Sequence, residues 1–138
     1  MKIVDENNCD FIQLKLVEVL PDYLPTLGDR KFSIKVNSRD FLAEIETVWF
    51  DYDAIQKFVA NINRMEKLRN GEAQITSMSP NKFCLRIGFY DGWGHVFFEG
   101  HVGEQYYDGI ESKIGFSIRP DTSMFDQYVS QLNLLLTS

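Results

Sequence analysis

The 138-residue sequence contains only two cysteines, two histidines and four prolines. Cys9 and Cys84 are far apart and show no CxxC spacing, so we expect free thiols rather than a disulfide or a zinc site. No window holds the run of about 18 apolar residues that a membrane-spanning helix requires. The first residues, MKIVDENNCDF, reach acidic and amide side chains too early for a signal peptide. We therefore expect a cytoplasmic protein without a membrane segment.

Basic residues are also scarce, because 14 Lys and Arg stand against 20 Asp and Glu and leave a net charge of −6. A nucleic-acid-binding protein needs clustered Lys and Arg to displace counterions, so this class is disfavoured. Residues 91–111 hold five acidic residues and no Lys or Arg, beside Trp93, Tyr106 and Tyr107. Acidic charge next to exposed aromatic side chains is typical of a surface that captures a basic protein. Charges on a sheet edge that prevent strand addition would give the same pattern.

Motifs of the common enzyme classes are missing as well. The chain has no G-x-S-x-G elbow, Walker loop, G-x-G-x-x-G or H-E-x-x-H. Two weaker arrangements remain: Glu44 and Glu46 lie about 7 Å apart on one strand face, and Cys84 could meet His95 across a hairpin. Surface strands often carry such carboxylates, and a half-buried thiol is common. We expect no enzyme, no cofactor and no metal site.

What is present is the composition of one ordinary globular domain, spanning residues 1–138. Apolar residues make up 44% of the chain and aromatic residues 14%, which supplies a core rich in strands. Alternating apolar residues predict seven strands, at 10–20, 30–38, 40–50, 72–78, 82–90, 94–102 and 110–118. In the strand 40–50 we expect Phe41, Ala43, Ile45 and Trp49 to face the core and Leu42, Val48 and Phe50 to face the other side.

Two segments have helical rather than strand periodicity. Apolar residues from Ile55 to Met65 form the stripe of an amphipathic helix, with Asp53 and Gln56 as a capping box and Gly71 after its end. Residues 121–136 form a second helix that begins at Asp121. The element order is βββα-ββββ-α, and short turns join consecutive strands. We therefore expect an α+β fold with one antiparallel sheet of about seven strands and both helices on one face.

The stretch DGWGHVFFEGH, residues 91–101, contains both histidines. On a strand His95, Glu99 and His101 share one face, but the two histidines stand about 20 Å apart. Zinc ligands lie about 2 Å from the ion, so these histidines cannot bind one metal. Cys84 is the only plausible ligand opposite Glu99 and His101. Asp91-Gly92 predicts a tight turn, where Trp93 either folds over the core edge or stays exposed as a protein contact.

Several segments resemble the WapI-type immunity protein family. These are DRKFSIKV, DFLAEIETVWF, a helix with Phe58, NGEAQI, FCLRI, GHVFFEGHV and FSIRPDTSMFDQYVSQL. The resemblance covers roughly residues 29–136. Members of the family are small bacterial α+β proteins associated with polymorphic toxin systems. The resemblance implies a cytoplasmic protein that binds and neutralises a cognate toxin without catalysis, and it transfers no functional residues.

These observations lead to one main hypothesis and two alternatives. The main hypothesis is a non-enzymatic immunity protein that blocks a basic toxin domain, for example a nuclease, by mimicking an acidic substrate surface. Its expected partner contacts are Asp91, Trp93, Glu99, His101 and Glu104. One alternative is a small-molecule enzyme or sensor that uses the outer sheet face, with Glu44, Glu46, Cys84 and His95. The other is a structural subunit of a larger assembly.

Overall fold

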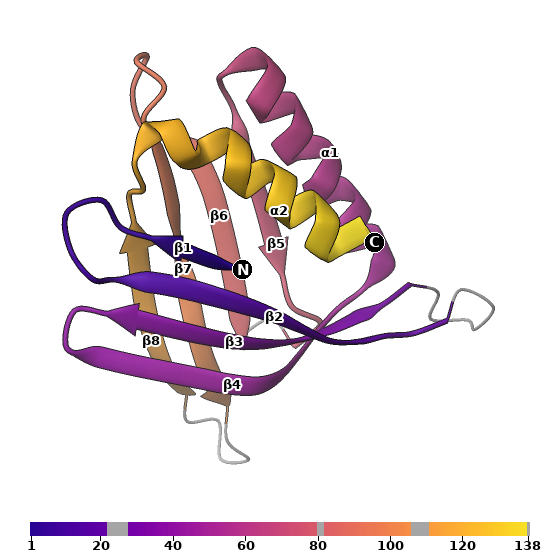
Figure 1. Ribbon diagram of the computed structural model, residues 1–138. Helices are drawn as coiled ribbons and strands as arrows, with labels where there is room; N and C mark the ends of the chain where they lie inside the picture. The colour runs from indigo at the N-terminus through magenta and orange to yellow at the C-terminus, as the bar shows by residue number, and fades with distance from the viewer. Residues whose placement is uncertain (22–27, 80–81, 106–110, 138) are drawn as a thin grey trace.

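The computed structural model describes residues 1–21, 28–79, 82–105 and 111–137. These residues form two four-stranded antiparallel sheets and two α-helices (Figure 1). In each sheet the spatial order of the strands follows their order in the chain. Sheet A contains β1 (Lys2–Val4), β2 (Phe11–Val19), β3 (Arg30–Ser38) and β4 (Phe41–Phe50). Sheet B contains β5 (Glu72–Thr76), β6 (Phe83–Phe89), β7 (Val96–Gln105) and β8 (Glu111–Ile118).

Two helices complete the fold. The helix α1 (Tyr52–Leu68) connects the two sheets, and a 3-10 turn (Thr122–Met124) leads into α2 (Phe125–Thr137). Asp51 caps α1, because its side chain accepts the Ala54 N–H at 2.7 Å. The expected capping box at Asp53 is therefore wrong. The side chain of Asp121 accepts the Ser123 N–H, which confirms a cap at this place, although it caps the 3-10 turn. No helix within the described ranges combines the length and apolarity that crossing a membrane requires.

The α+β class is confirmed, but the single sheet of about seven strands is wrong. The helix α1 separates β4 from β5, and β5 pairs with β6 instead of extending the first sheet. Alternation of apolar residues shows that one face of a strand is buried but not which layer covers it. Here the apolar face of each sheet is covered partly by the other sheet. The short β1 was not expected, because three residues are too few to show alternation.

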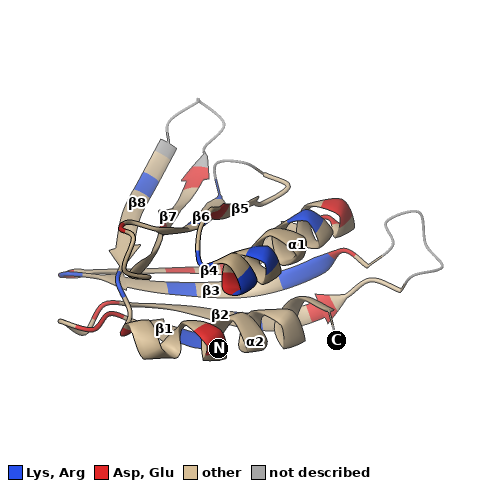
Figure 2. Ribbon diagram, turned by 90° about the horizontal axis from the view of Figure 1, so that it is seen from above, with Lys and Arg blue, Asp and Glu red and all other residues tan. Residues whose placement is uncertain are grey.

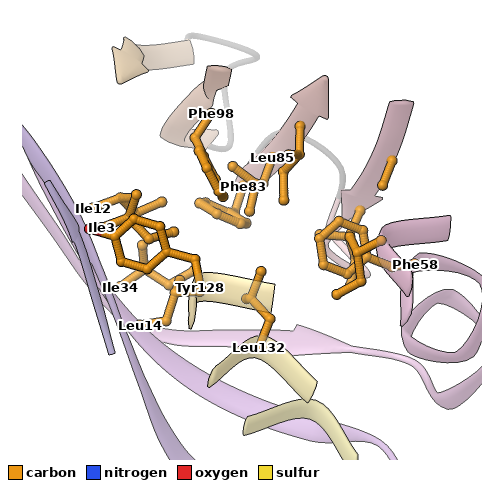
Figure 3. Packing of buried hydrophobic residues seen from close by; sticks show 14 of the residues in the cluster. Ile3, Ile12, Leu14, Ile34, Phe58, Phe83, Leu85, Phe98, Tyr128 and Leu132 are labelled. Atoms are coloured by element: carbon orange, nitrogen blue, oxygen red, sulfur yellow. The ribbon is translucent and has the colours of Figure 1, made fainter. Parts of the chain in front are cut away.

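The core lies between the two sheets and the two helices (Figure 3). Fully buried side chains from both sheets and both helices meet there, among them Ile34, Phe83, Phe58 and Leu132. A chain of aromatic rings crosses from sheet A to sheet B. Its successive centroid distances are 5.6 Å for Phe32–Phe50, 5.8 Å for Phe50–Phe83 and 6.3 Å for Phe83–Phe116. These contacts join the sheets into one core.

A β-bulge changes the orientation of the second half of β4. Ile45 pairs with Ile34 and Val48 pairs with Phe32, so two residues of β4 lie opposite the single residue Ser33. Val48 and Phe50 are therefore buried, at 0% and 3% exposure, while Phe41 is 64% exposed. The expectation that Val48 and Phe50 face outward and Phe41 and Trp49 inward is wrong. Ile45 is buried, as expected.

Candidate functional site

The expected site residues belong to β7 and the turn before it. Val96, Phe98 and Val102 are buried in the core. The alternate residues Glu99 and His101 therefore lie on the outer face of sheet B, as predicted. Across the ladder Cys84 pairs with His101 and Arg86 with Glu99. Tyr106, Tyr107 and the expected turn at Asp108-Gly109 lie outside the described residues.

Asp91 organises the β6–β7 turn. One carboxylate oxygen accepts the backbone N–H groups of Trp93 at 2.9 Å and His95 at 3.2 Å, and the other contacts the His95 ring nitrogen Nδ1. An ionised carboxylate only accepts hydrogen bonds, so Nδ1 is the donor. The His95 ring also stacks on Tyr90. Asp91 is thus occupied inside its own turn, and its loss would disturb the turn as well as any partner contact.

Trp93 is the most exposed of the large apolar side chains in the described residues, at 86%. Its backbone is held by Asp91, whereas its indole has no ring contact in this part of the chain. Of the two sequence-based alternatives, exposure is therefore confirmed and folding over the core edge is wrong. An indole on an ordered turn loses little conformational entropy on contact with a partner.

The environment of Asp91 makes its contribution to stability depend on pH. Partial desolvation raises the pKa of Asp91, but the hydrogen bonds from His95 and the Trp93 N–H outweigh it, so the pKa lies below its ordinary value. A depressed carboxyl pKa stabilises the folded state above the unfolded-chain pKa of about 3.9, and this contribution is lost as pH falls through the folded-state pKa.

We expect Asp91→Asn to lower the free energy of unfolding at pH 6 and to lower it less at pH 3. Asparagine keeps a carbonyl oxygen for the two backbone N–H groups but loses the charge facing His95. Urea unfolding of both proteins at the two pH values measures the difference. A destabilisation that stays constant or grows toward pH 3 would contradict this role of the carboxylate.

Glu99 and Glu104 are both paired with basic residues of the neighbouring strand region. Arg86 contacts Glu99 and also lies 3.4 Å from Glu72, and the hydrogen bond to Glu99 raises the pKa of Arg86 above its ordinary value. The Nζ atom of Lys82 lies 3.8 Å from Glu104. Acidic and basic residues are accordingly interspersed over the molecule (Figure 2). The lack of Lys and Arg in residues 91–111 therefore does not produce a purely acidic surface.

The five expected contact residues do not form one patch. Asp91 and Trp93 lie at the turn, Glu99 and His101 on the outer face in the middle of β7, and Glu104 at its other end. Glu104 lies two residues after the buried Val102 and lines a small groove with Glu44 and Ile45 of β4. It therefore belongs to the opposite face of sheet B from Glu99 and His101.

A larger cleft of about 820 Å³ lies beside the middle of sheet B. It contains Cys84, Arg86, Glu99 and His101 from the outer face, five consecutive residues of β8, and four residues of sheet A and its loops, namely Asp10, Ser38, Arg39 and Phe41. Sequence reasoning missed the sheet A residues. No local pattern could indicate them, because the packing of one sheet against the other brings them here.

The residues that line the cleft include a cysteine, Cys84, and a histidine, His101. The Sγ atom of Cys84 accepts hydrogen bonds from Gln74 at 3.4 Å and Thr76 at 3.7 Å. The Nε2 atom of His101 is buried and has no hydrogen-bond partner among the described residues. The free-thiol prediction is confirmed for both cysteines. Within the described ranges no three His, Cys, Asp or Glu side chains are placed to hold a metal ion.

The residues expected for a small-molecule site are not brought together. Glu44 and Glu46 are exposed on β4 in sheet A, Cys84 is near the start of β6, and His95 belongs to the β6–β7 turn at the other end of that strand. The residue opposite Cys84 is His101, not His95. The proposed Cys84–His95 pair is therefore wrong.

Comparison with known proteins gives no further assignment. No protein-family model, curated protein or solved structure matches this chain.

Proposed function

We propose that this protein is a non-enzymatic binding protein, an immunity protein that acts in the cytoplasm and neutralises a cognate toxin domain of basic character. The observation that carries the proposal is Trp93, a large aromatic side chain 86% exposed on a turn fixed by Asp91. Exposed tryptophan on a rigid element is a typical energetic centre of a protein interface. The resemblance to WapI-type immunity proteins supports a toxin as the partner.

The expected basic character of the partner rests on the net charge of −6. Net charge accelerates encounter with an oppositely charged protein, and this effect falls with ionic strength. The carboxylates available for steering are not those first expected, since Glu99 and Glu104 have basic partners. Asp40, Glu44 and Glu46, on or next to β4, are exposed and form no ion pair within the described part of the chain.

The test begins with capture of partners by tagged protein in lysate of the native cells, followed by washing at low and high salt. We expect a basic protein that is released at high salt and whose purified toxic domain is inhibited by this protein. Capture of no specific protein, or of one whose activity is unaffected, would contradict the proposal.

Trp93→Ala is expected to weaken binding of the captured partner at least about 30-fold, because interface hot spots contribute roughly 2 kcal/mol or more. The stability of the protein should not change, since the indole is exposed. Val17→Ala is the matched control: it shortens an apolar side chain 51% exposed on β2 and should leave affinity unaltered. Isothermal calorimetry measures both. Equal affinities of the two variants would exclude Trp93 as the contact.

Small-molecule binding is a second candidate, favoured by the cleft of about 820 Å³ that holds Cys84 and His101. Its volume lies in the range of ligand pockets. Native mass spectrometry of protein from the same purification tests this candidate. A bound small molecule that is lost on replacement of His101 by alanine would support it, and protein of unmodified mass alone would count against it.

A further inference from the structure

The four outer strands of the two sheets are not equally protected against pairing with another chain. β1 has only three residues, and β5 has five and lies beside α1 (Figure 1). β4 contains the bulge, and two of its backbone carbonyl groups already accept hydrogen bonds. Thr47 accepts from Lys82 Nζ at 3.1 Å, and Trp49 accepts from the Met78 N–H at 2.9 Å. Short length, bulges and covered backbone groups are the usual protections of a sheet edge.

β8 is neither short nor bulged, and among the described residues its backbone is covered only from Arg119 on, where Asp5 and Glu6 bind it. Its eight residues pair with β7 in one unbroken register, from Gln105↔Glu111 to Phe98↔Ile118, and include no proline. Three of its exposed positions, Ser112, Gly115 and Ser117, are small and uncharged, and Lys113 is the exposed charged position among the described residues of this strand. Apart from the ladder with β7, no hydrogen bond between described residues involves the backbone of Ile114–Ile118. An edge of this kind is a template for strand addition.

The free edge of β8 lies in the large cleft. Five consecutive β8 residues, Lys113–Ser117, line it. Successive side chains of a strand point to opposite faces, so a cleft lined by five in a row follows the edge of the strand rather than one face. The opposite wall is the tip of the β3–β4 hairpin, with Arg39 and the exposed ring of Phe41.

Two nitrogen-bearing side chains in the cleft have no hydrogen-bond or ion-pair partner for these nitrogens in the described part of the chain. One is the buried Nε2 of His101. The other is the exposed guanidinium of Arg39, which forms no ion pair there. Its backbone N–H is already fixed by Asp10 at 2.7 Å, so the Asp10 carboxylate is engaged. The guanidinium favours a ligand that carries carboxylates, and His101 can donate a hydrogen bond to one in the tautomer that carries the proton on Nε2.

We infer that the edge of β8 receives an extended segment of the partner protein, which adds to sheet B as a fifth strand and carries acidic side chains toward Arg39 and His101. This inference rests on the proposed function. Backbone hydrogen bonds would supply affinity, and alternate side chains would supply specificity. A partner that is basic overall can still contain such a segment, because net charge governs encounter while local charges set the register.

The test uses three synthetic peptides with blocked ends, titrated into 15N-labelled protein and followed by NMR. The first is Thr-Val-Glu-Val-Glu-Val-Thr, the second has Lys in place of both Glu, and the third has Pro in place of the central Val. We expect the first to shift the amide signals of Ile114–Ile118 saturably. The second should bind at least about tenfold more weakly, and the third should not bind, since proline cannot continue the ladder.

A charge reversal tests the recognition chemistry. Arg39→Glu should reverse the preference, so that the Lys peptide binds more tightly than the Glu peptide. Lys57→Glu, an equivalent change at an exposed position on α1, should leave the preference unchanged. Absence of shifts on β8, shifts at another edge, or equal binding of the Glu and Lys peptides to the unaltered protein would overturn the inference. Signals of β8 that depend on protein concentration without peptide would identify a second copy as the occupant and would also overturn it.

The outcome is separable from that of the proposed function. If a toxin partner is captured but the peptides leave β8 unaffected, strand addition at the edge of β8 is refuted and the proposed function stands. If the Glu peptide binds β8 but no partner is captured, the edge is supported and the immunity function fails.

Discussion

Replacement of Phe83 by alanine is expected to lower the free energy of unfolding by about 3–5 kcal/mol, the usual range for removing a buried phenylalanine ring. Phe83 is 1% exposed and belongs to sheet B, and its ring contacts Phe50 of sheet A and Phe116 of β8. A small apolar cavity already lies beside it between the sheets and helices. The new void would join that cavity, and collapse of the surroundings is restricted because both sheets border it.

Urea unfolding of the two proteins at neutral pH measures this effect. Phe41→Ala is the matched control, because it removes the same ring from a position 64% exposed and should change stability by less than about 0.5 kcal/mol. If the Phe83 variant lost less than about 1 kcal/mol, the aromatic contacts between the sheets would not be a main source of stability.

Gly100→Ala is expected to destabilise the protein by about 3 kcal/mol, at the upper end of the range for overpacked sites. A Cβ atom at this position would lie 1.9 Å from the carbonyl oxygen of Cys84 and 2.8 Å from its carbonyl carbon. Both are backbone atoms of β6, so they cannot move aside without disturbing the ladder between β6 and β7. The ring of Phe116, at 3.1 Å, restricts the space further.

Gly115 provides the control on the adjacent strand. The nearest atom to a Cβ there is the Gly100 carbonyl oxygen at 3.8 Å, an ordinary contact. Gly115→Ala should leave stability unchanged or raise it by up to about 1 kcal/mol, since alanine reduces the entropy of the unfolded chain. Thermal unfolding of both variants gives the comparison. Similar midpoints for the two alanine variants would contradict the tight packing at Gly100.

The secondary structure was largely predictable from the sequence, and the layering was not. Alternation in β2 and β3 and the helical spacing from Ile55 to Met65 report on neighbours within one element, where the geometry is fixed. Whether an apolar strand face meets a helix or another sheet depends on contacts between residues far apart in the chain. The bulge in β4 is a similar case, because one extra residue exchanges the faces of Val48 and Phe50 without a local signal.

The candidate site was predictable to the same extent. The common face of Glu99 and His101 follows from strand geometry alone, whereas the partner of Cys84 depends on the register of the hairpin, so the expected pair with His95 was wrong. The charge argument failed because it counted residues along the chain, whereas Arg86 and Lys82 come from the neighbouring strand region and neutralise Glu99 and Glu104. The position of Arg39 in the cleft depends on how sheet A crosses sheet B, which no short segment encodes.

The division of the strands into two consecutive meanders has a consequence for the order of folding. Within each meander every strand pairs with the strand that follows it in the chain, so pairing joins residues close in the sequence and can begin locally. The helix α2 differs, because it follows all eight strands in the described chain and packs against both halves. Its Tyr128 hydroxyl accepts the N–H of Val4 in β1 of sheet A, and the ring of the same residue contacts Phe98 in β7 of sheet B. The two halves can thus acquire their pairing separately, while closure of the shared core waits for the helix that follows both of them in the chain.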